Sequence, residues 1–113
     1  GPAGSGAIEQ KLVESLAAVG VPAESTDLDG RSDYAAFLAA GIPVGGIFTG
    51  AEERKSAEQA RRWGGQAEAP FDPCYHQACD RIDRIDRVAL DRNTDALAGT
   101  LATYALSTAG LKP

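Results

Sequence analysis

Residues 72–80, Asp-Pro-Cys-Tyr-His-Gln-Ala-Cys-Asp, restrict the fold of this chain more than any other segment. They contain both cysteines and the only histidine of the 113-residue sequence. Cysteines five positions apart can close a small covalent ring, and so tight a ring fixes the backbone inside it. That ring would hold Tyr75 and His76, whose side chains suit metal ligation or donation to a developing oxyanion. We therefore expect this segment to carry the chemistry of the chain.

The spacing alone leaves three states open for Cys74 and Cys79: a disulfide, part of a metal site, or two buried thiols. A zinc site built here would use both thiolates and His76, and no further histidine or cysteine is present to complete a tetrahedron. We favour the disulfide. A disulfide in turn predicts a secreted or cell-envelope protein.

Composition excludes two classes of partner. The formal net charge is −5, with acidic and basic residues interspersed, which argues against nucleic-acid binding and against an anionic membrane surface. No apolar run approaches the roughly 20 residues of a membrane-spanning helix. We interpret residues 1–5 as an expression-tag remnant and residues 6–113 as one domain or a piece of one.

The hydrophobic pattern predicts an α/β fold, in which a small two- or three-stranded sheet is flanked by three or four helices. Residues 42–48 form a short apolar run bounded by glycines, which is typical of a strand buried on both faces. Residues 21–26 are a weaker candidate for an edge strand. Helices are predicted at residues 7–19, 33–40, near 55–63 and about 86–107.

Side-chain positions refine three of these predictions. Ser32 is a candidate N-cap for the second helix, and Gly41 follows its expected end. The Arg-Ile-Asp repeat at 81–86 predicts a charged helix start with Ile82 and Ile85 facing inward. The last helix carries one apolar face, formed by Leu90, Leu97, Leu101, Tyr104 and Ala105.

Three segments resemble a known family in both order and spacing. They are residues 30–37 (Gly-Arg-Ser-Asp-Tyr-Ala-Ala-Phe), residues 40–52 (Ala-Gly-Ile-Pro-Val-Gly-Gly-Ile-Phe-Thr-Gly-Ala-Glu) and residues 75–80 (Tyr-His-Gln-Ala-Cys-Asp). Together they are similar to the secreted bacterial di-zinc aminopeptidases of clan MH, of the streptomycete leucine-aminopeptidase type. The resemblance covers nearly all of the chain after residue 5. It implies the C-terminal portion of an aminopeptidase-like catalytic domain, forming one flank of a larger mixed sheet.

The resemblance assigns roles within the cysteine segment. It implies that His76 is a zinc ligand and that Tyr75 polarises the scissile carbonyl and stabilises the tetrahedral oxyanion. It also implies that Cys74 and Cys79 form a small disulfide ring around this pair.

Other residues receive roles in the same way. Gly30 and Arg31 would lie beside the amino end of a bound peptide, largely through backbone atoms, and Phe48 would line the pocket for its first side chain. Asp91 and Asp95 fall where streptomycete relatives hold a structural calcium ion.

Departures from the family pattern matter as much. Two zinc ions need several protein ligands, a bridging carboxylate and a glutamate base, and most of these have no counterpart in the sequence. Glu52 and Glu53 follow a Phe-Thr-Gly turn, so we interpret them as solvated surface. The usual Ser-Asp-His is Ser-Asp-Tyr here, with Tyr34 in the third position.

Plainer roles remain open for each candidate. His76 could be an exposed loop histidine, Phe48 a core residue, Arg31 part of a surface ion pair, and Asp91 and Asp95 solvent-facing charges. At the level of function, the sequence predicts a zinc-dependent aminopeptidase acting on N-terminal residues of peptides, of which this fragment alone is inactive. The alternative is a non-enzymatic peptide- or partner-binding module, with self-association through an exposed sheet edge.

Overall fold

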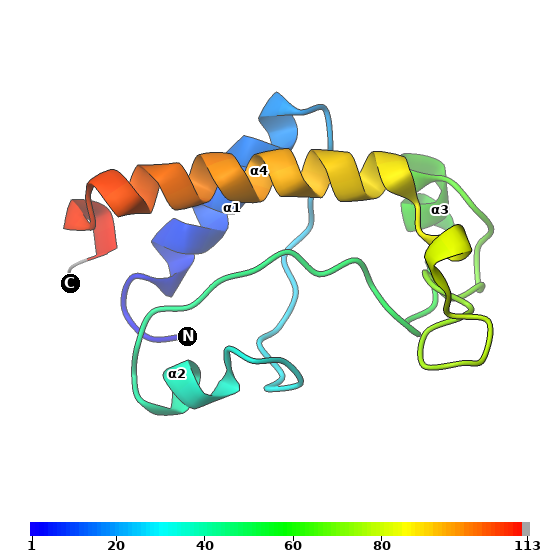
Figure 1. Cartoon of the computed structure of the whole chain (residues 1–113), viewed down its shortest axis with the longest axis horizontal. Coiled ribbons are helices and arrows are strands. Elements are labelled where there is room, and N and C mark those ends of the chain that lie inside the picture. Colours follow the sequence, from blue (N-terminus) through cyan, green and yellow to red (C-terminus); the bar gives the residue numbers. More distant parts are fainter. Residues whose placement is uncertain (112–113) are drawn as a thin grey trace. The chain divides into compact units, whose positions relative to one another are not determined.

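The protein is helical. The computed structural model describes residues 1–111, and Figure 1 shows its helices joined by long irregular segments. The four α-helices and two short 3₁₀ helices are α1 (Ser5–Ala18), α2 (Ala35–Ala39), α3 (Ala57–Trp63), η1 (Ile82–Arg84), α4 (Arg87–Leu106) and η2 (Ala109–Leu111). None of the helices in this described part is long and apolar enough to cross a membrane.

The predicted α/β class is wrong. Across residues 1–111 there is no strand, and the one β-bridge is an isolated antiparallel pair between Arg54 and Pro70. The small two- or three-stranded sheet is therefore absent from the described chain, including the edge strand expected at 21–26. The predicted helices are present, and α1, α3 and α4 lie close to the expected ranges.

The apolar run at 42–48 shows why the sheet does not form. A strand needs a neighbouring strand to bond its alternate N–H and C=O groups, and no second strand lies among residues 1–111. Instead, the N–H of Val44 donates to the hydroxyl of Ser5 at 3.1 Å. Val44 is buried, whereas Ile42 and Phe48 at the ends of the run are exposed. Only the centre of the segment is therefore covered.

The chain divides into two compact units, each described here by itself. The terminal unit consists of Gly1–Ile47 and the described residues from Val88 onward. The central unit is Phe48–Arg87. Most of α4 belongs to the terminal unit, and α3 and η1 belong to the central one.

The core of the terminal unit lies along α1. Leu12 and Leu16, one turn apart, are its most buried large side chains, as the period of the predicted helix requires. Gly20 has a φ of 77° just after α1, a conformation that glycine adopts without steric cost.

Helix α4 contacts α1 through small residues. Ala96 and Thr100 are buried, and the Thr100 hydroxyl donates to the Ser15 hydroxyl at 3.0 Å. The hydroxyl of Tyr104 donates to the backbone carbonyl of Ala7, also at 3.0 Å. Figure 1 shows α4 crossing α1, and these two bonds fix where the helices meet.

The shorter helices depart from the predicted details. No side chain caps α2, because the Ser32 hydroxyl donates to Asp33 instead. Ile82 and Ile85 are exposed rather than inward-facing, and the segment around them is the 3₁₀ turn η1.

The central unit is held by local bonds. Ser56 and Gln59 form a reciprocal capping box at the start of α3, with bonds of 2.9 and 3.1 Å. Lys55 exchanges backbone bonds with Glu68 and Ala69, and its ammonium donates to the carbonyl of Pro70 at 3.1 Å. These bonds join the segment just before α3 to residues 68–70 in the loop that follows the helix.

Phe71 is the aromatic centre of this unit. The ring of Trp63 lies 5.9 Å from it, and the ammonium of Lys55 lies 5.0 Å from its centroid. A side chain at Gly50, whose φ is 98°, would overlap the Phe71 ring. Gly50 therefore lets the backbone pass directly beside that ring.

Two leucines test where the core lies. Leu16→Ala should lower the free energy of unfolding by about 2–5 kcal/mol, because it leaves a cavity at a buried site. Leu101→Ala, the matched control on α4, should change it by less than about 1 kcal/mol, because 71% of Leu101 is already exposed. Urea denaturation of both variants measures the difference, and equal losses would contradict this core.

Candidate functional site

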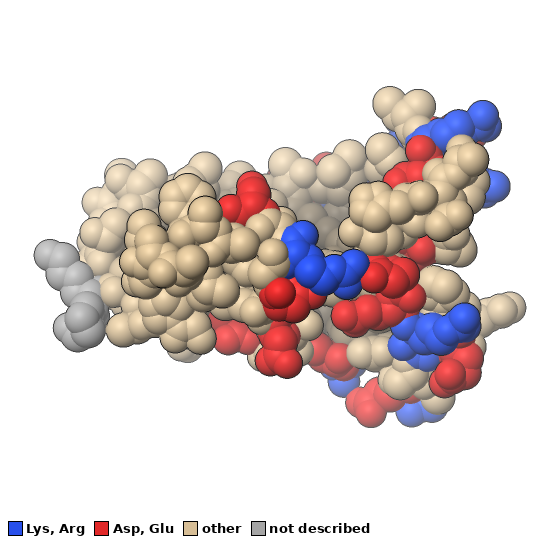
Figure 2. Space-filling model, turned by 90° about the horizontal axis from the view of Figure 1, so that it is seen from below, with Lys and Arg blue, Asp and Glu red and all other residues tan. Residues whose placement is uncertain are grey.

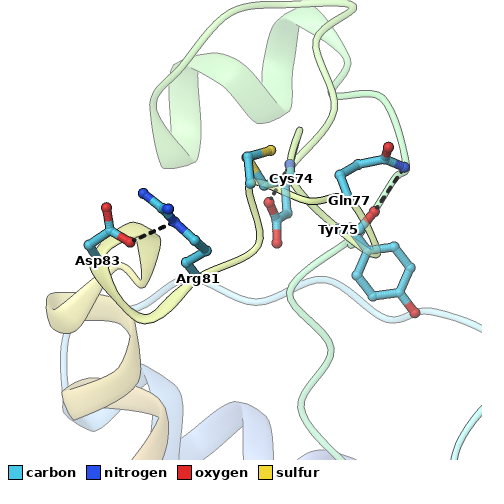
Figure 3. Close-up of a disulfide and its surroundings, with 7 residues drawn as sticks. Cys74, Tyr75, Gln77, Arg81 and Asp83 are labelled. Carbon is cyan, nitrogen blue, oxygen red and sulfur yellow. Dashed lines mark hydrogen bonds and ion pairs between the residues drawn. A yellow bond between two sulfur atoms is a disulfide. The ribbon is translucent and has the colours of Figure 1, made fainter.

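The cysteine segment is a closed ring. Cys74 and Cys79 form a disulfide with their Cα atoms 5.2 Å apart, which confirms the predicted pairing. The Cys74 N–H donates to the Asp72 carboxylate at 2.8 Å, and the Gln77 N–H donates to the Cys74 carbonyl at 2.9 Å. Figure 3 shows the turn that these bonds produce. The ring is therefore fixed both covalently and by its own backbone.

Tyr75 and His76 lie inside this ring. Their ring centroids are 4.0 Å apart, with a 34° angle between the planes. Tyr75 is half-buried and His76 is exposed, so the imidazole is accessible rather than packed among aliphatic side chains. In Figure 3 the phenol of Tyr75 points away from the disulfide. Both polar groups can therefore meet a ligand from outside the ring.

His76 has an unusual backbone conformation. Its φ of 55° lies in the left-handed region, where residues other than glycine are uncommon. Such conformations persist where surrounding bonds impose them, and here the disulfide and the turn hydrogen bonds do so. The imidazole is thus placed by the ring closure.

A zinc centre does not fit the described residues on their own. Both cysteines are oxidised, so neither offers a thiolate. His76 is the only histidine, and residues 1–111 hold no group of three His, Cys, Asp or Glu side chains close enough to bind one metal ion. A structural or catalytic zinc site takes three or four protein ligands. His76 can supply one of them.

A second cluster surrounds Gly30. The Tyr34 hydroxyl accepts the Gly30 N–H at 2.8 Å and donates to the Asp29 carboxylate at 3.1 Å. The same carboxylate oxygen accepts the Arg31 N–H at 2.9 Å. The Arg31 guanidinium lies 3.9 Å from the other oxygen of Asp29 in an exposed ion pair. Asp29 and Tyr34 together clamp the turn that carries Gly30 and Arg31.

This clamp lowers the pKa of the Asp29 carboxyl. The main cause of the lowered pKa is the Arg31 N–H. Desolvation, the next largest effect, opposes it, and the Tyr34 hydroxyl and the Arg31 charge add smaller lowering effects. Hydrogen bonds donated to the ionised form stabilise it, so the turn keeps a negative charge at neutral pH.

The clamp also changes what the turn can offer a ligand. Both N–H groups at Gly30 and Arg31 are already bonded within the turn. A ligand beside this segment would therefore meet acceptors rather than free backbone donors there.

The remaining candidates are exposed. Phe48 is 51% exposed and begins the central unit. Asp91 and Asp95 are exposed and lie one turn apart on α4. Gly30 and Arg31 belong to the terminal unit, and Tyr75 and His76 to the central one, so each group is described within its own unit. Glu52 and Glu53 lie on the surface, as predicted.

Charge is mixed over the surface. Figure 2 shows acidic and basic side chains next to one another on the face it displays. Two of the ion pairs, Arg62 with Glu58 and Arg81 with Asp83, are largely exposed and close in sequence. Exposed pairs of this kind contribute little to stability.

The chain matches Peptidase family M28 over residues 1–101. It belongs to that family. The resemblance to zinc aminopeptidases, drawn from the Tyr-His ring and the glycine-rich segments, is thereby confirmed at the level of family.

Several curated proteins that are similar to this chain are named aminopeptidases, in agreement with the family match. The chain is 51% identical over 109 residues to the probable lipoprotein aminopeptidase LpqL of Mycobacterium tuberculosis, covering 96% of this chain and 22% of that protein. It is 51% identical over 102 residues to leupeptin-inactivating enzyme 1 of Streptomyces exfoliatus, covering 89% of this chain and 23% of the relative. With the probable leucine aminopeptidase 2 of Aspergillus oryzae it shares 47% identity over 105 residues, or 93% of this chain and 21% of the relative. The chain thus spans little more than a fifth of these relatives.

Sequence reasoning missed two residues of the clamp. The sequence identifies Tyr34 only as a departure from the family pattern, and it does not single out Asp29. The signal was present in Asp29-Gly30-Arg31, because an aspartate two residues before a free N–H commonly accepts its hydrogen bond. The other partner, the Tyr34 hydroxyl, reaches back four and five residues, and no sequence pattern predicts that bond.

The clamp can be tested by titration. Tyr34→Phe removes one hydrogen bond to the Asp29 carboxylate, so the pKa of Asp29 should rise toward its ordinary value. NMR titration of the Asp29 carboxyl carbon measures this. Tyr104→Phe is the control, since its hydroxyl bonds to Ala7 and not to Asp29. An unchanged Asp29 pKa in Tyr34→Phe would contradict the clamp.

The lowered pKa of Asp29 also makes the stability of the fold depend on pH. A pKa that is lower in the folded state stabilises the fold above the unfolded-state pKa, about 3.9, and this contribution disappears as the pH falls through the folded value. The part of the stability difference between wild type and Tyr34→Phe that comes from Asp29 should therefore be present at pH 7. It should vanish once Asp29 is protonated in both states.

The disulfide makes a separate prediction. A ring of this size should contribute about 2 kcal/mol to the free energy of unfolding through loop closure. The double variant Cys74→Ser, Cys79→Ser should lose that amount in urea denaturation. Reductant should destabilise the wild type equally and leave the double variant unchanged. A wild-type chain that takes up two alkyl groups without reduction would contradict the bond.

Proposed function

We propose that this chain supplies part of the active site of an M28 aminopeptidase, which removes N-terminal residues from peptides. The observation that carries the proposal is the ring closed by Cys74 and Cys79, which holds Tyr75 and His76 side by side and accessible. The M28 match over residues 1–101 and the aminopeptidase names of the relatives support it.

In this proposal Tyr75 is the catalytic residue contributed by the chain. A phenol O–H held on a rigid turn can donate to a peptide carbonyl oxygen and, more strongly, to the oxyanion that develops from it. The covalent ring supports this role, because a donor already in position loses little freedom during the reaction.

His76 is proposed as one zinc ligand of a site completed by residues outside this chain. The structure supplies one accessible imidazole and no other members of a metal cluster among residues 1–111. The fragment alone is therefore proposed to be inactive. Two zinc ions are proposed only for the complete enzyme.

Substrate contacts are proposed at the clamped turn and at Phe48. The turn carrying Gly30 and Arg31 offers acceptors beside the Asp29 charge, which suits the ammonium group at the start of a peptide. Exposed Phe48 would contact an apolar first side chain. A calcium ion at Asp91 and Asp95 is proposed only with further donors, because two exposed carboxylates one turn apart do not make a site.

The proposed location is secreted or at the cell envelope. Disulfides persist in oxidising compartments, and one of the relatives is named a lipoprotein aminopeptidase.

One observation favours the alternative of a binding module. The terminal unit has an open hollow of about 340 Å³ whose apolar walls include Phe37, Ile42 and Val44, with Asp33 and Tyr34 also lining it. It could receive an apolar side chain of a peptide without any chemistry. Peptide binding that survives His76→Ala and Tyr75→Phe, with no hydrolysis in any context, would favour this module.

A chimera tests the enzymatic proposal. This chain is placed in the M. tuberculosis relative instead of its matched 109-residue segment, and hydrolysis of a leucine chromogenic amide is measured. Tyr75→Phe should lower kcat by about 10²–10³-fold with a small change in KM, as loss of one oxyanion donor does. His76→Ala should abolish zinc-dependent activity.

Controls accompany the chimera. Tyr104→Phe removes a hydroxyl bonded to Ala7, outside the proposed site, and should leave kcat unchanged. The isolated chain with added zinc should show no hydrolysis. Full activity of the Tyr75→Phe chimera would contradict the role of Tyr75, and chelator-sensitive activity of the isolated chain would contradict its inactivity.

A further inference from the structure

Helix α4 exposes a line of leucines. Leu90, Leu97 and Leu101 recur at i, i+7 and i+11, which places them on one face of the helix. They are 55%, 47% and 71% exposed. We call these three residues the leucine stripe.

The stripe is not the face that holds α4 in the terminal unit. That contact uses the bonds from Thr100 to Ser15 and from Tyr104 to Ala7, and Ala96, one turn before Thr100, is also almost fully buried. The small residues therefore face α1, and the large apolar side chains point elsewhere. Among the described residues, the stripe is left about half exposed or more along its length.

Hydrophobic burial favours the opposite arrangement in an isolated domain. Burying a leucine contributes about 1.5–3 kcal/mol, and burying an alanine much less. In α4, small residues contact the neighbouring helix and the leucines remain exposed. This pattern is typical of a helix that packs against other elements on two sides. Phe37 and Ile42 of the same unit are also about half exposed. The terminal unit therefore exposes several large apolar side chains, three of them on one helix face.

The relatives extend well beyond the region matched by this chain. Matched relatives are four to five times longer than their aligned part, since this chain covers only 20–23% of each. We propose that the leucine stripe docks onto the part of an M28 peptidase domain that lies outside the region matched by this chain. The stripe is then an internal packing surface of the complete domain, available for assembly in trans.

A second copy of the chain fits the stripe less well. A stable interface between two proteins buries about 800 Å² on each partner, and three leucines on one convex helix offer much less. The rest of a peptidase domain can contact the stripe and extend beyond it in one continuous core. The inference rests on family membership and not on the roles of Tyr75 and His76, so binding and hydrolysis are measured separately.

The first experiment measures association. The M. tuberculosis relative lacking its matched 109-residue segment is mixed with this chain, and the stoichiometry and dissociation constant are determined by light scattering and calorimetry. A 1:1 complex is expected. Leu97→Glu should weaken it at least tenfold, because it buries a charge in an apolar contact. Ala102→Glu, which adds the same charge on an exposed position away from the stripe, should leave it unchanged.

A second measurement tests the same proposal if the shortened relative does not fold. In the chimera described above, Leu97→Glu should lower the Tm more than Ala102→Glu does. In the isolated chain the difference between the two substitutions should be smaller than in the chimera, because about half of Leu97 is already exposed there. Equal effects in the chimera would overturn the proposal. So would a homodimer of this chain that Leu97→Glu dissociates and Ala102→Glu preserves.

Discussion

The contact between α1 and α4 is the interaction on which the terminal unit depends. It joins segments more than eighty residues apart through Ala96, Thr100 and the hydroxyl bonds to Ser15 and Ala7. Small residues let the two helices approach closely, and the hydroxyls satisfy each other or a carbonyl at the contact. The consequence is that α4 turns its leucines away from α1. The stability of the unit and its exposed apolar surface thus have one cause.

The central unit depends on closures that are local in sequence. The disulfide spans five positions, the capping box three, and the bonds of Lys55 reach only to residues 68–70. Such bonds restrict the backbone without a large core, which suits a segment whose buried apolar residues are few. Tyr75 and His76 lie on this part of the chain. Their geometry is therefore set by short-range bonds that a fragment can keep.

These differences explain how far the sequence could predict the structure. Helix period, glycine stops and the cysteine spacing are local signals, and they gave α1, α3, α4 and the ring. The strand predicted at 42–48 was wrong because the apolar pattern of a strand buried on both faces does not show whether a partner strand is present. The Tyr34–Asp29 bond was missed for a related reason, since a tyrosine hydroxyl reaching back five residues leaves no pattern in the sequence.

The wrong prediction and the leucine stripe have a common physical origin. Residues 42–48 and the apolar face of α4 both carry more hydrophobic side chains than the described chain can cover. On the proposal that the stripe docks onto the rest of an M28 domain, both segments would carry the burial pattern of that larger domain, and the described chain would show only part of its contacts. Exposed Ile42, Phe48 and Leu97 are therefore informative, because they show where apolar contacts are unfilled. The same reasoning applies to the proposed zinc ligand His76, an accessible imidazole placed by a rigid ring, because residues 1–111 do not bring together the other donors that a metal ion requires.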